Sequence, residues 1–146
     1  MSMIITEKYK SKLPNYILDK NPVFVESSEV QNGVICDVYS FNTLSEISDS
    51  DLGIVVIKSG HSTPLQRILT GEKTIEGHIS GSGYLVVDTG TLDQKKFEVQ
   101  VDCTFEITLN IGQTMQWFST SDLVIYEICY PKYSDGRFET INNQIQ

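Results

Sequence analysis

The chain has two histidines, and these are the first side chains to consider for chemistry because imidazole gains and loses protons near neutral pH. His78 is the better candidate, since Glu76 lies two positions earlier and so on the same face of an extended segment. A carboxylate there can orient the ring or raise its pKa, and such a pair suits proton abstraction from a sugar or carbonyl compound. Tyr126 or Tyr84 would then be the proton donor.

The residues around this pair leave its orientation open. Ile75 and Ile79 have the opposite parity, and apolar side chains on a half-buried strand normally face the interior. That rule turns Glu76 and His78 toward solvent or gives them a structural role. The opposite register would place both inside the protein.

Polar side chains elsewhere are candidates for binding a ligand. Gln66 and Gln116 have amides that donate and accept hydrogen bonds, which suits sugar hydroxyls, although a buried amide can equally serve the backbone. Trp117 can stack on a sugar face or pack in the core. Arg67 can bind an anionic group or pair with a surface carboxylate.

Glu127 interrupts the apolar segment Leu123–Tyr130 on the parity of its hydrophobic neighbours. A carboxylate in such a place is costly unless it is paired or has a function. Pairing with Arg67 or Lys58 is one interpretation, and contact with a ligand is the other.

Other reactive groups lack a supporting pattern. No serine lies in a G-x-S-x-G motif, and Gly81-Ser82-Gly83 is a turn with no helix after it to hold a phosphate. Cys36, Cys103 and Cys129 are odd in number and form no C-x-x-C pair, so we expect reduced thiols, as in a cytosolic protein.

Charge and composition limit the partners. The chain has 146 residues, 40% of them hydrophobic, which fits one globular domain, and its net charge is −8. An acidic surface without a basic cluster disfavours nucleic acid and anionic membranes. The first residues form no apolar signal segment and no apolar run is long enough to span a bilayer, so we expect a cytoplasmic protein.

Alternation of apolar and polar residues predicts the elements that position these side chains. It is clearest over Phe97–Leu109, which is too long for one strand, so we expect a turn near Asp102. Short segments separated by Gly, Asn, Asp and Ser turns predict further strands at Gly33–Phe41, Leu52–Lys58, Thr74–Ile79, Tyr84–Asp88, Gln113–Phe118 and Leu123–Tyr130. The pattern indicates an all-β protein. Residues 1–22 form an N-terminal extension, and residues 23–146 form the single domain.

Two stretches of the chain share a pattern of glycines and a proline. From Ser59 to Gly83 the chain reads SGHSTPLQRILTGEKTIEGHISGSG, with Gly60, Pro64, Gly81 and Gly83, and from Leu109 it reads LNIGQTMQWFSTSDLVIYEICYP, with Gly112. These stretches resemble the first and second motifs of the cupins, the double-stranded β-helix or jelly-roll barrel family. The resemblance covers residues 33–131. It implies that Glu76 and His78 face inward, contrary to the rule applied above.

The metal-binding histidines of that family are missing. Aligned on Pro64, the family's H-x-H pair falls on Gln66 and Ile68, and its glutamate falls near Thr74. The stretch after Gly112 that supplies the third histidine contains none. Three nitrogen or oxygen ligands are needed to hold such a metal, so we expect no metal and no other cofactor.

Three hypotheses follow from the resemblance. The first is a metal-free cupin that binds a polar small molecule, such as a sugar, through Gln66, Gln116, Trp117, Arg67 and Glu127. The second is a cofactor-free isomerase or epimerase with His78 as base, Glu76 orienting it and Tyr126 as proton donor. The third is an assembly module, because cupins commonly form homodimers through sheet faces or exchanged N-terminal strands. In that case residues 1–22 would pack on a partner subunit.

Overall fold

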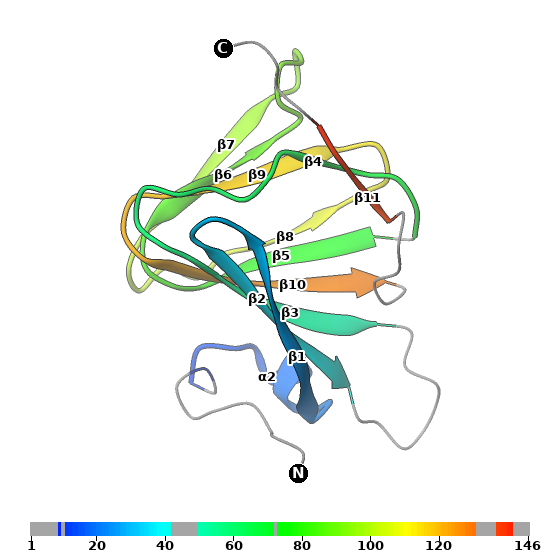
Figure 1. Cartoon of the computed structure of the whole chain (residues 1–146), viewed down its shortest axis with the longest axis vertical. Coiled ribbons are helices and arrows are strands. Elements are labelled where there is room, and N and C mark those ends of the chain that lie inside the picture. Colours follow the sequence, from blue (N-terminus) through cyan, green and yellow to red (C-terminus); the bar gives the residue numbers. More distant parts are fainter. Residues whose placement is uncertain (1–8, 10, 42–49, 72, 131–136, 142–146) are drawn as a thin grey trace.

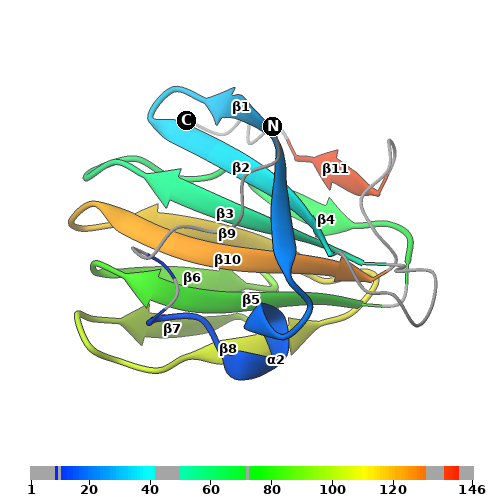
Figure 2. The same ribbon diagram turned by 90° about the horizontal axis from the view of Figure 1, so that it is seen from below.

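The computed structural model describes residues 9, 11–41, 50–71, 73–130 and 137–141, which form two facing antiparallel β-sheets and one short helix (Figure 1). The first sheet has the strand order β1-β2-β3-β10-β5-β8, which Figure 2 shows from one edge to the other. Its strands are β1 (Pro22–Gln31), β2 (Val34–Phe41), β3 (Asp51–Ile57), β10 (Leu123–Tyr130), β5 (Lys73–Ser80) and β8 (Glu106–Leu109).

The second sheet has the order β11-β4-β9-β6-β7. Its strands are β11 (Phe138–Thr140), β4 (Gln66–Ile68), β9 (Thr114–Ser119), β6 (Gly83–Val87) and β7 (Lys95–Val99). The all-β class and the double-stranded β-helix layout are confirmed. The described strands form two separate sheets that are not hydrogen-bonded to each other into a closed cylinder.

The long alternating segment shows where the chain changes sheets. Its first part is β7 in the second sheet and its last part is β8 in the first, and Asp102 lies in the turn between them with a φ of 70°. Asp tolerates this left-handed conformation better than most residues do. The turn near Asp102 is therefore confirmed, and it separates β7 from β8, which pair with strands of different sheets.

The interior between the sheets is filled by apolar side chains from both layers. They are Val34, Val55, Ile57, Ile68, Leu85, Val87, Val99, Leu109, Met115, Trp117, Leu123 and Ile125. Burial of this surface is the main stabilising contribution of the fold.

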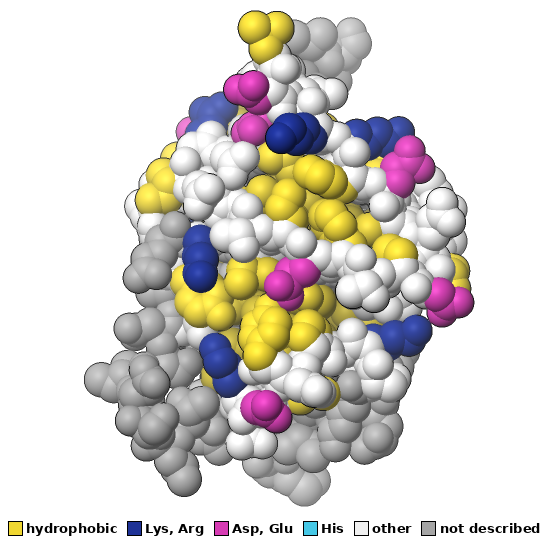
Figure 3. All heavy atoms as spheres, turned by 180° about the vertical axis from the view of Figure 1, so that it is seen from behind, with side chains coloured by type: hydrophobic (Ala, Val, Ile, Leu, Met, Phe, Trp, Pro, Cys, Tyr) yellow, Lys and Arg dark blue, Asp and Glu magenta, His cyan; other side chains and the backbone are white. Residues whose placement is uncertain are grey.

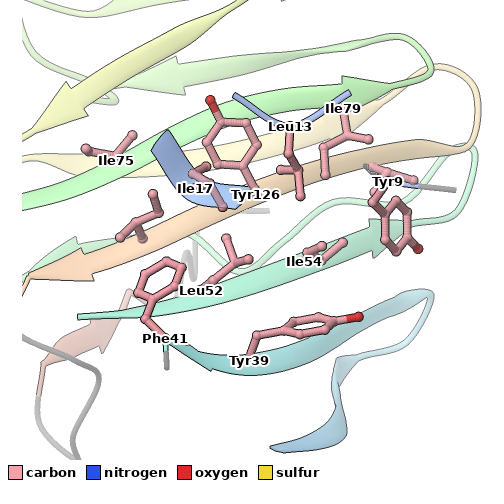
Figure 4. Packing of buried hydrophobic residues seen from close by; sticks show 12 residues of the cluster. Tyr9, Leu13, Ile17, Tyr39, Phe41, Leu52, Ile54, Ile75, Ile79 and Tyr126 are labelled. Atoms are coloured by element: carbon pink, nitrogen blue, oxygen red, sulfur yellow. The ribbon is translucent and has the colours of Figure 1, made fainter. Parts of the chain in front are cut away.

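A second hydrophobic cluster covers the outer face of the first sheet. The N-terminal segment supplies Tyr9, Leu13 and Ile17, the last from α2 (Asn15–Leu18). Figure 4 shows these side chains over Tyr39, Phe41, Leu52, Ile54, Ile75, Ile79 and Tyr126 of the sheet. The described part of residues 1–22 thus packs on this chain's own sheet, while residues 1–8 and 10 lie outside the described structure.

This outer layer resolves the orientation that the sequence left open. Strand β5 is buried on both of its faces: Ile75 and Ile79 contact the outer cluster, and Glu76 and His78 face inward. The rule that apolar side chains take the interior assumes one solvated face, which β5 does not have. The register of the cupin frame is the one that the structure adopts, and the solvent-facing interpretation is wrong.

The remaining surface is mixed. Figure 3 shows the back of the molecule, where hydrophobic side chains gather in patches between Lys, Arg, Asp and Glu side chains. Among the described residues, no helix has the length and the apolar character that crossing a membrane requires.

Candidate ligand-binding cavity

A cavity of about 380 Å³ lies between the two sheets, within the size range of small-molecule sites. One part of its wall is apolar and includes Val34, Val55, Met115, Ile125 and Phe138. The rest is polar or polarisable: Glu26, Ser28, Cys36, Asp51, Thr63, Gln66, Glu76, Trp117, Glu127 and Cys129.

Two glutamates face each other across neighbouring strands of this wall. Glu76 on β5 is the register partner of Glu127 on β10, and both side chains line the cavity. Glu76 is only 1% exposed. Its Oε1 accepts a hydrogen bond of 2.8 Å from the indole Nε1–H of Trp117, whereas no described residue donates a hydrogen bond to its Oε2. A buried polar atom in this condition is rare and calls for an explanation.

The environment of Glu76 favours its neutral form. Burial raises the pKa of Glu76 well above its ordinary value of 4.5, and Glu127 raises this pKa further, through its negative charge and as the acceptor of a side-chain hydrogen bond from protonated Glu76. The hydrogen bond from Trp117 acts in the opposite direction. Glu76 therefore retains its proton over a pH range in which an exposed glutamate is ionised.

His78 does not join this pair. Its ring lies near the turns at Gly81 and Cys103, with Nε2 2.8 Å from the Gly81 carbonyl oxygen and Nδ1 3.3 Å from the Cys103 carbonyl oxygen. Because a carbonyl oxygen can only accept, a ring nitrogen that bonds to either carbonyl must carry the hydrogen. His78 does not line the cavity, and it connects two turns of the fold.

Tyr126 lies on the opposite face of β10 from Glu127, in the outer cluster, and its hydroxyl donates to Glu106 Oε2 at 2.5 Å. Tyr84 stacks on Phe118, with ring centroids 4.9 Å apart, and does not line the cavity either. The structure therefore does not bring His78, Glu76 and Tyr126 together.

The predicted ligand-binding residues divide into two groups. Gln66, Trp117 and Glu127 line the cavity. The amide of Gln116, which is not part of the lining, donates to the Thr63 carbonyl oxygen at 2.9 Å. Arg67 is exposed and forms an ion pair with Glu139, with Nη1 3.6 Å from Oε1. Neither it nor any other described residue forms an ion pair with Glu127.

Several lining residues were missed by sequence reasoning. Glu26 and Ser28 come from β1, which was not recognised as a strand, although Val23, Phe24 and Val25 are residues that favour strands. Thr63 precedes Pro64 in the first cupin stretch, and its hydroxyl accepts the backbone N–H of Trp117 at 2.9 Å. The two thiols in the wall, Cys36 and Cys129, are free.

The residues at the family's metal-ligand positions do not fit a metal. Ile68 is fully buried in the inter-sheet core, and the Thr74 hydroxyl accepts a hydrogen bond from Arg137 at 3.2 Å. No group of three or more His, Cys, Asp or Glu side chains within the described ranges is placed to hold a metal ion.

Comparison with known proteins gives structural likeness only. The sequence matches no protein-family model and no curated protein sequence. Three similar structures are KdgF from Halomonas sp. (10% identity, TM-score 0.58), CapF, a capsular polysaccharide assembling protein from Staphylococcus aureus (11%, 0.57), and a Streptomyces PAC13 variant with uridine (11%, 0.57).

The extent of these matches differs. The matched region covers 76% of this chain and 92% of KdgF, and 80% of this chain and 84% of PAC13. It covers 83% of this chain but only 34% of CapF, so this chain corresponds to about a third of that protein.

Proposed function

This chain has a cupin fold, and on that premise we propose that it binds a small polar molecule in the cavity between its sheets. The observation that carries the proposal is Glu76 Oε2, an oxygen of a buried side chain that lines the cavity and receives no hydrogen bond from the residues that the structure describes. Leaving a buried polar atom without a donor costs about 1–3 kcal/mol, and a ligand hydroxyl, which both donates and accepts, can remove this cost whether or not Glu76 holds its proton.

The other lining groups suit a hydroxylated ligand. Gln66 has an amide that can donate and accept, and Glu127 accepts hydrogen bonds from hydroxyl groups. Trp117 and Met115 offer apolar surface for the carbon skeleton. PAC13, which has a similar fold, was solved with uridine, and this supports a hydroxylated ligand of moderate size. A sugar or a sugar derivative is the class that we propose.

We propose that binding needs no metal, because the residues that replace the family's ligands are Gln66, Ile68 and Thr74. Elemental analysis after purification without chelators tests this point. We expect less than a tenth of a zinc, iron, manganese or nickel ion per chain. About one ion per chain would contradict the proposal. The expected homodimer also stays a prediction, and its mass in solution tests it.

Trp117 is the only tryptophan of the chain and lies in the cavity wall, so its fluorescence reports binding directly. Monosaccharides, polyols and nucleosides would be titrated at millimolar concentration. We expect a saturable change for at least one of them. Gln66→Ala should weaken that binding about three- to tenfold, the effect of one lost hydrogen bond. The matched variant is Gln100→Ala, because Gln100 is exposed and lies outside the cavity wall.

Two outcomes would count against the proposal. One is the absence of a saturable signal with every compound of the panel. The other is binding that Gln66→Ala and Gln100→Ala change equally, because the ligand would then lie outside the cavity.

A further inference from the structure

The charge of the cavity points to a narrower ligand class. Resting on the proposed function above, we infer that the cavity selects molecules that carry a protonated amine, with the ammonium group held between Glu76 and Glu127. The partner is thus an amino-polyol or amino-sugar type of molecule, rather than a neutral or anionic sugar.

The first argument is the sign of the charge. Four carboxyl side chains line the cavity, those of Glu26, Asp51, Glu76 and Glu127, and among the described residues no Lys, Arg or His belongs to its lining. A buried Arg137 lies outside the lining, where its Nη2 donates to the carbonyl oxygens of Lys73 and Tyr130. A carboxylate or phosphate that enters this cavity meets like charge from Glu76 and Glu127 once both are ionised, which costs more as water is displaced. A cation is attracted.

The second argument is the unmet hydrogen-bonding capacity of Glu76. Trp117 supplies one donor to Oε1, and Oε2 has none among the described residues. An ammonium group has three N–H donors and no acceptor. It can therefore donate to Glu76 Oε2 and to Glu127 at once, whereas a hydroxyl group has one hydrogen to donate. Charge-assisted hydrogen bonds of this kind are about twice as strong as neutral ones.

The third argument concerns what neutralises the glutamate pair. The titratable groups that share the described cavity wall with Glu76 are carboxylic acids and thiols rather than bases: Glu127, Asp51, Glu26, Cys36 and Cys129. Without a ligand, the raised pKa of Glu76 means that a proton supplies the missing positive charge. A bound ammonium would replace that proton. Binding should therefore release a proton, and affinity should increase with pH until Glu76 is ionised in the free protein.

The test uses three probes of nearly the same shape. Glucamine, sorbitol and gluconate share one polyhydroxyl chain and end in an ammonium, a hydroxyl and a carboxylate group. Each would be titrated against the full chain at neutral pH in the presence of a chelator, with Trp117 fluorescence and calorimetry as readouts. We expect glucamine to bind at least about tenfold more tightly than sorbitol, and gluconate to bind most weakly.

Two further measurements connect the preference to the glutamate pair. Calorimetry in buffers of different ionisation enthalpy should show proton release with glucamine and none with sorbitol. Glu127→Gln should weaken glucamine binding at least about tenfold and sorbitol binding less than threefold. Glu98→Gln makes the same change of charge on exposed β7, outside the cavity, and should leave both unchanged.

The outcomes separate the two proposals. If sorbitol or gluconate binds as tightly as glucamine, the inferred selectivity for amines is wrong while binding of a polar ligand in the cavity stands. The inferred selectivity for amines is also wrong if Glu127→Gln and Glu98→Gln weaken glucamine binding equally. If none of the three probes binds at tens of millimolar, the amine inference fails, and the wider panel then decides the proposed function. Should Glu127→Gln fail to fold, the comparison of the three probes on the unmodified chain still decides.

Discussion

Two glutamates on neighbouring strands of the first sheet have opposite surroundings. Glu106 on β8 is the register partner of Gly77, the residue that follows Glu76 on β5. On the outer side, Glu106 Oε2 accepts hydrogen bonds from the hydroxyls of both Tyr16 and Tyr126, each at 2.5 Å. On the inner side, Glu76 receives one hydrogen bond, from Trp117, and no other described residue donates to its second oxygen.

The difference separates a carboxylate that supports the fold from one that is available to a ligand. The outer glutamate is exposed, satisfied by two donors, and joins the N-terminal segment to the sheet through Tyr16. Burial and the hydrogen bond to Glu106 raise the pKa of both tyrosines, so these hydroxyls keep their protons and remain donors. The inner glutamate, Glu76, is buried, and one of its two oxygens receives no hydrogen bond from the described residues, which lowers stability unless a ligand binds. A fold retains such a cost most readily at a functional site.

Of the substitutions considered, Gly77→Ala should lower the free energy of unfolding most, and it acts on the outer face of the first sheet. A Cβ atom at this position would lie 2.1 Å from Cζ and 2.4 Å from Oη of Tyr126, so the ring could not reach Glu106 without moving. Because Tyr126 is 2% exposed and packed on all sides, we expect a loss of about 3 kcal/mol in the free energy of unfolding, at the upper end for an overpacked core. Urea denaturation measures it.

A second substitution checks the cause. Combining Gly77→Ala with Tyr126→Leu should destabilise by less than the sum of the two single changes, because the clash is then relieved. Additive effects would mean that the glycine is needed for another reason.

Glu76→Gln and Glu106→Gln should have opposite signs, which tests the comparison directly. The inner change removes a buried acid that burial and Glu127 disfavour, and we expect it to raise the free energy of unfolding by about 1–3 kcal/mol. The outer change weakens two charge-assisted hydrogen bonds at an exposed site and should lower this free energy by about 1 kcal/mol or less. Denaturation at neutral pH compares them. Destabilisation by both would show that Glu76 is a structural residue like Glu106.

The pH dependence of the free energy of unfolding should show that the stabilisation expected for Glu76→Gln comes from removing the Glu76 carboxyl group. Its pKa is raised in the folded protein, so between the ordinary value of 4.5 and the raised one the native state holds more protons than the unfolded state. Stability is therefore lost as pH rises through this window. Below it the acid is protonated in both states. The difference between Glu76→Gln and the unmodified protein should be small near pH 4 and should widen toward neutrality. A constant difference would contradict the assigned pKa direction.

Tyr16→Phe should have the smallest effect. It removes one of two donors to Glu106 from a side chain that is 39% exposed, so we expect a loss of about 0.5–1 kcal/mol. Tyr126→Phe removes the other donor from a buried side chain and should cost more. Because both hydroxyls donate to one oxygen, the double variant should be non-additive. Additivity within error would show that the two hydrogen bonds act independently.

The sequence predicted the strands well where turns were marked. The segment Leu123–Tyr130 is β10 with the expected bounds, and Thr74–Ile79 lies within β5. Gly, Asn and Asp at the turns fix where a chain reverses, and this information is local. The strands β1, β4 and β11 were missed. Two of them have only three residues, too few for an alternating pattern to be visible.

The site was predicted only in part, and the reason is geometric. Gln66, Trp117 and Glu127 were singled out and do line the cavity, whereas Gln116 and Arg67 point elsewhere. Glu76 and His78 were predicted to act as a pair because of their residue types. In the structure Glu76 bonds to Trp117, whereas His78 contacts the turns at Gly81 and Cys103. Which groups meet across two sheets depends on register and twist rather than on spacing along one strand.

By itself the sequence determined the all-β class, the turn positions and the absence of histidines where a cupin would bind its metal, because these depend on residue types and local spacing. Only the tertiary structure decided which face of β5 is the interior, since Tyr9, Leu13 and Ile17 cover the outer face and both parities are buried. It also decided that one glutamate meets two tyrosines and the other meets a second glutamate. Contacts between distant segments set the charge, the burial and therefore the chemistry of a side chain.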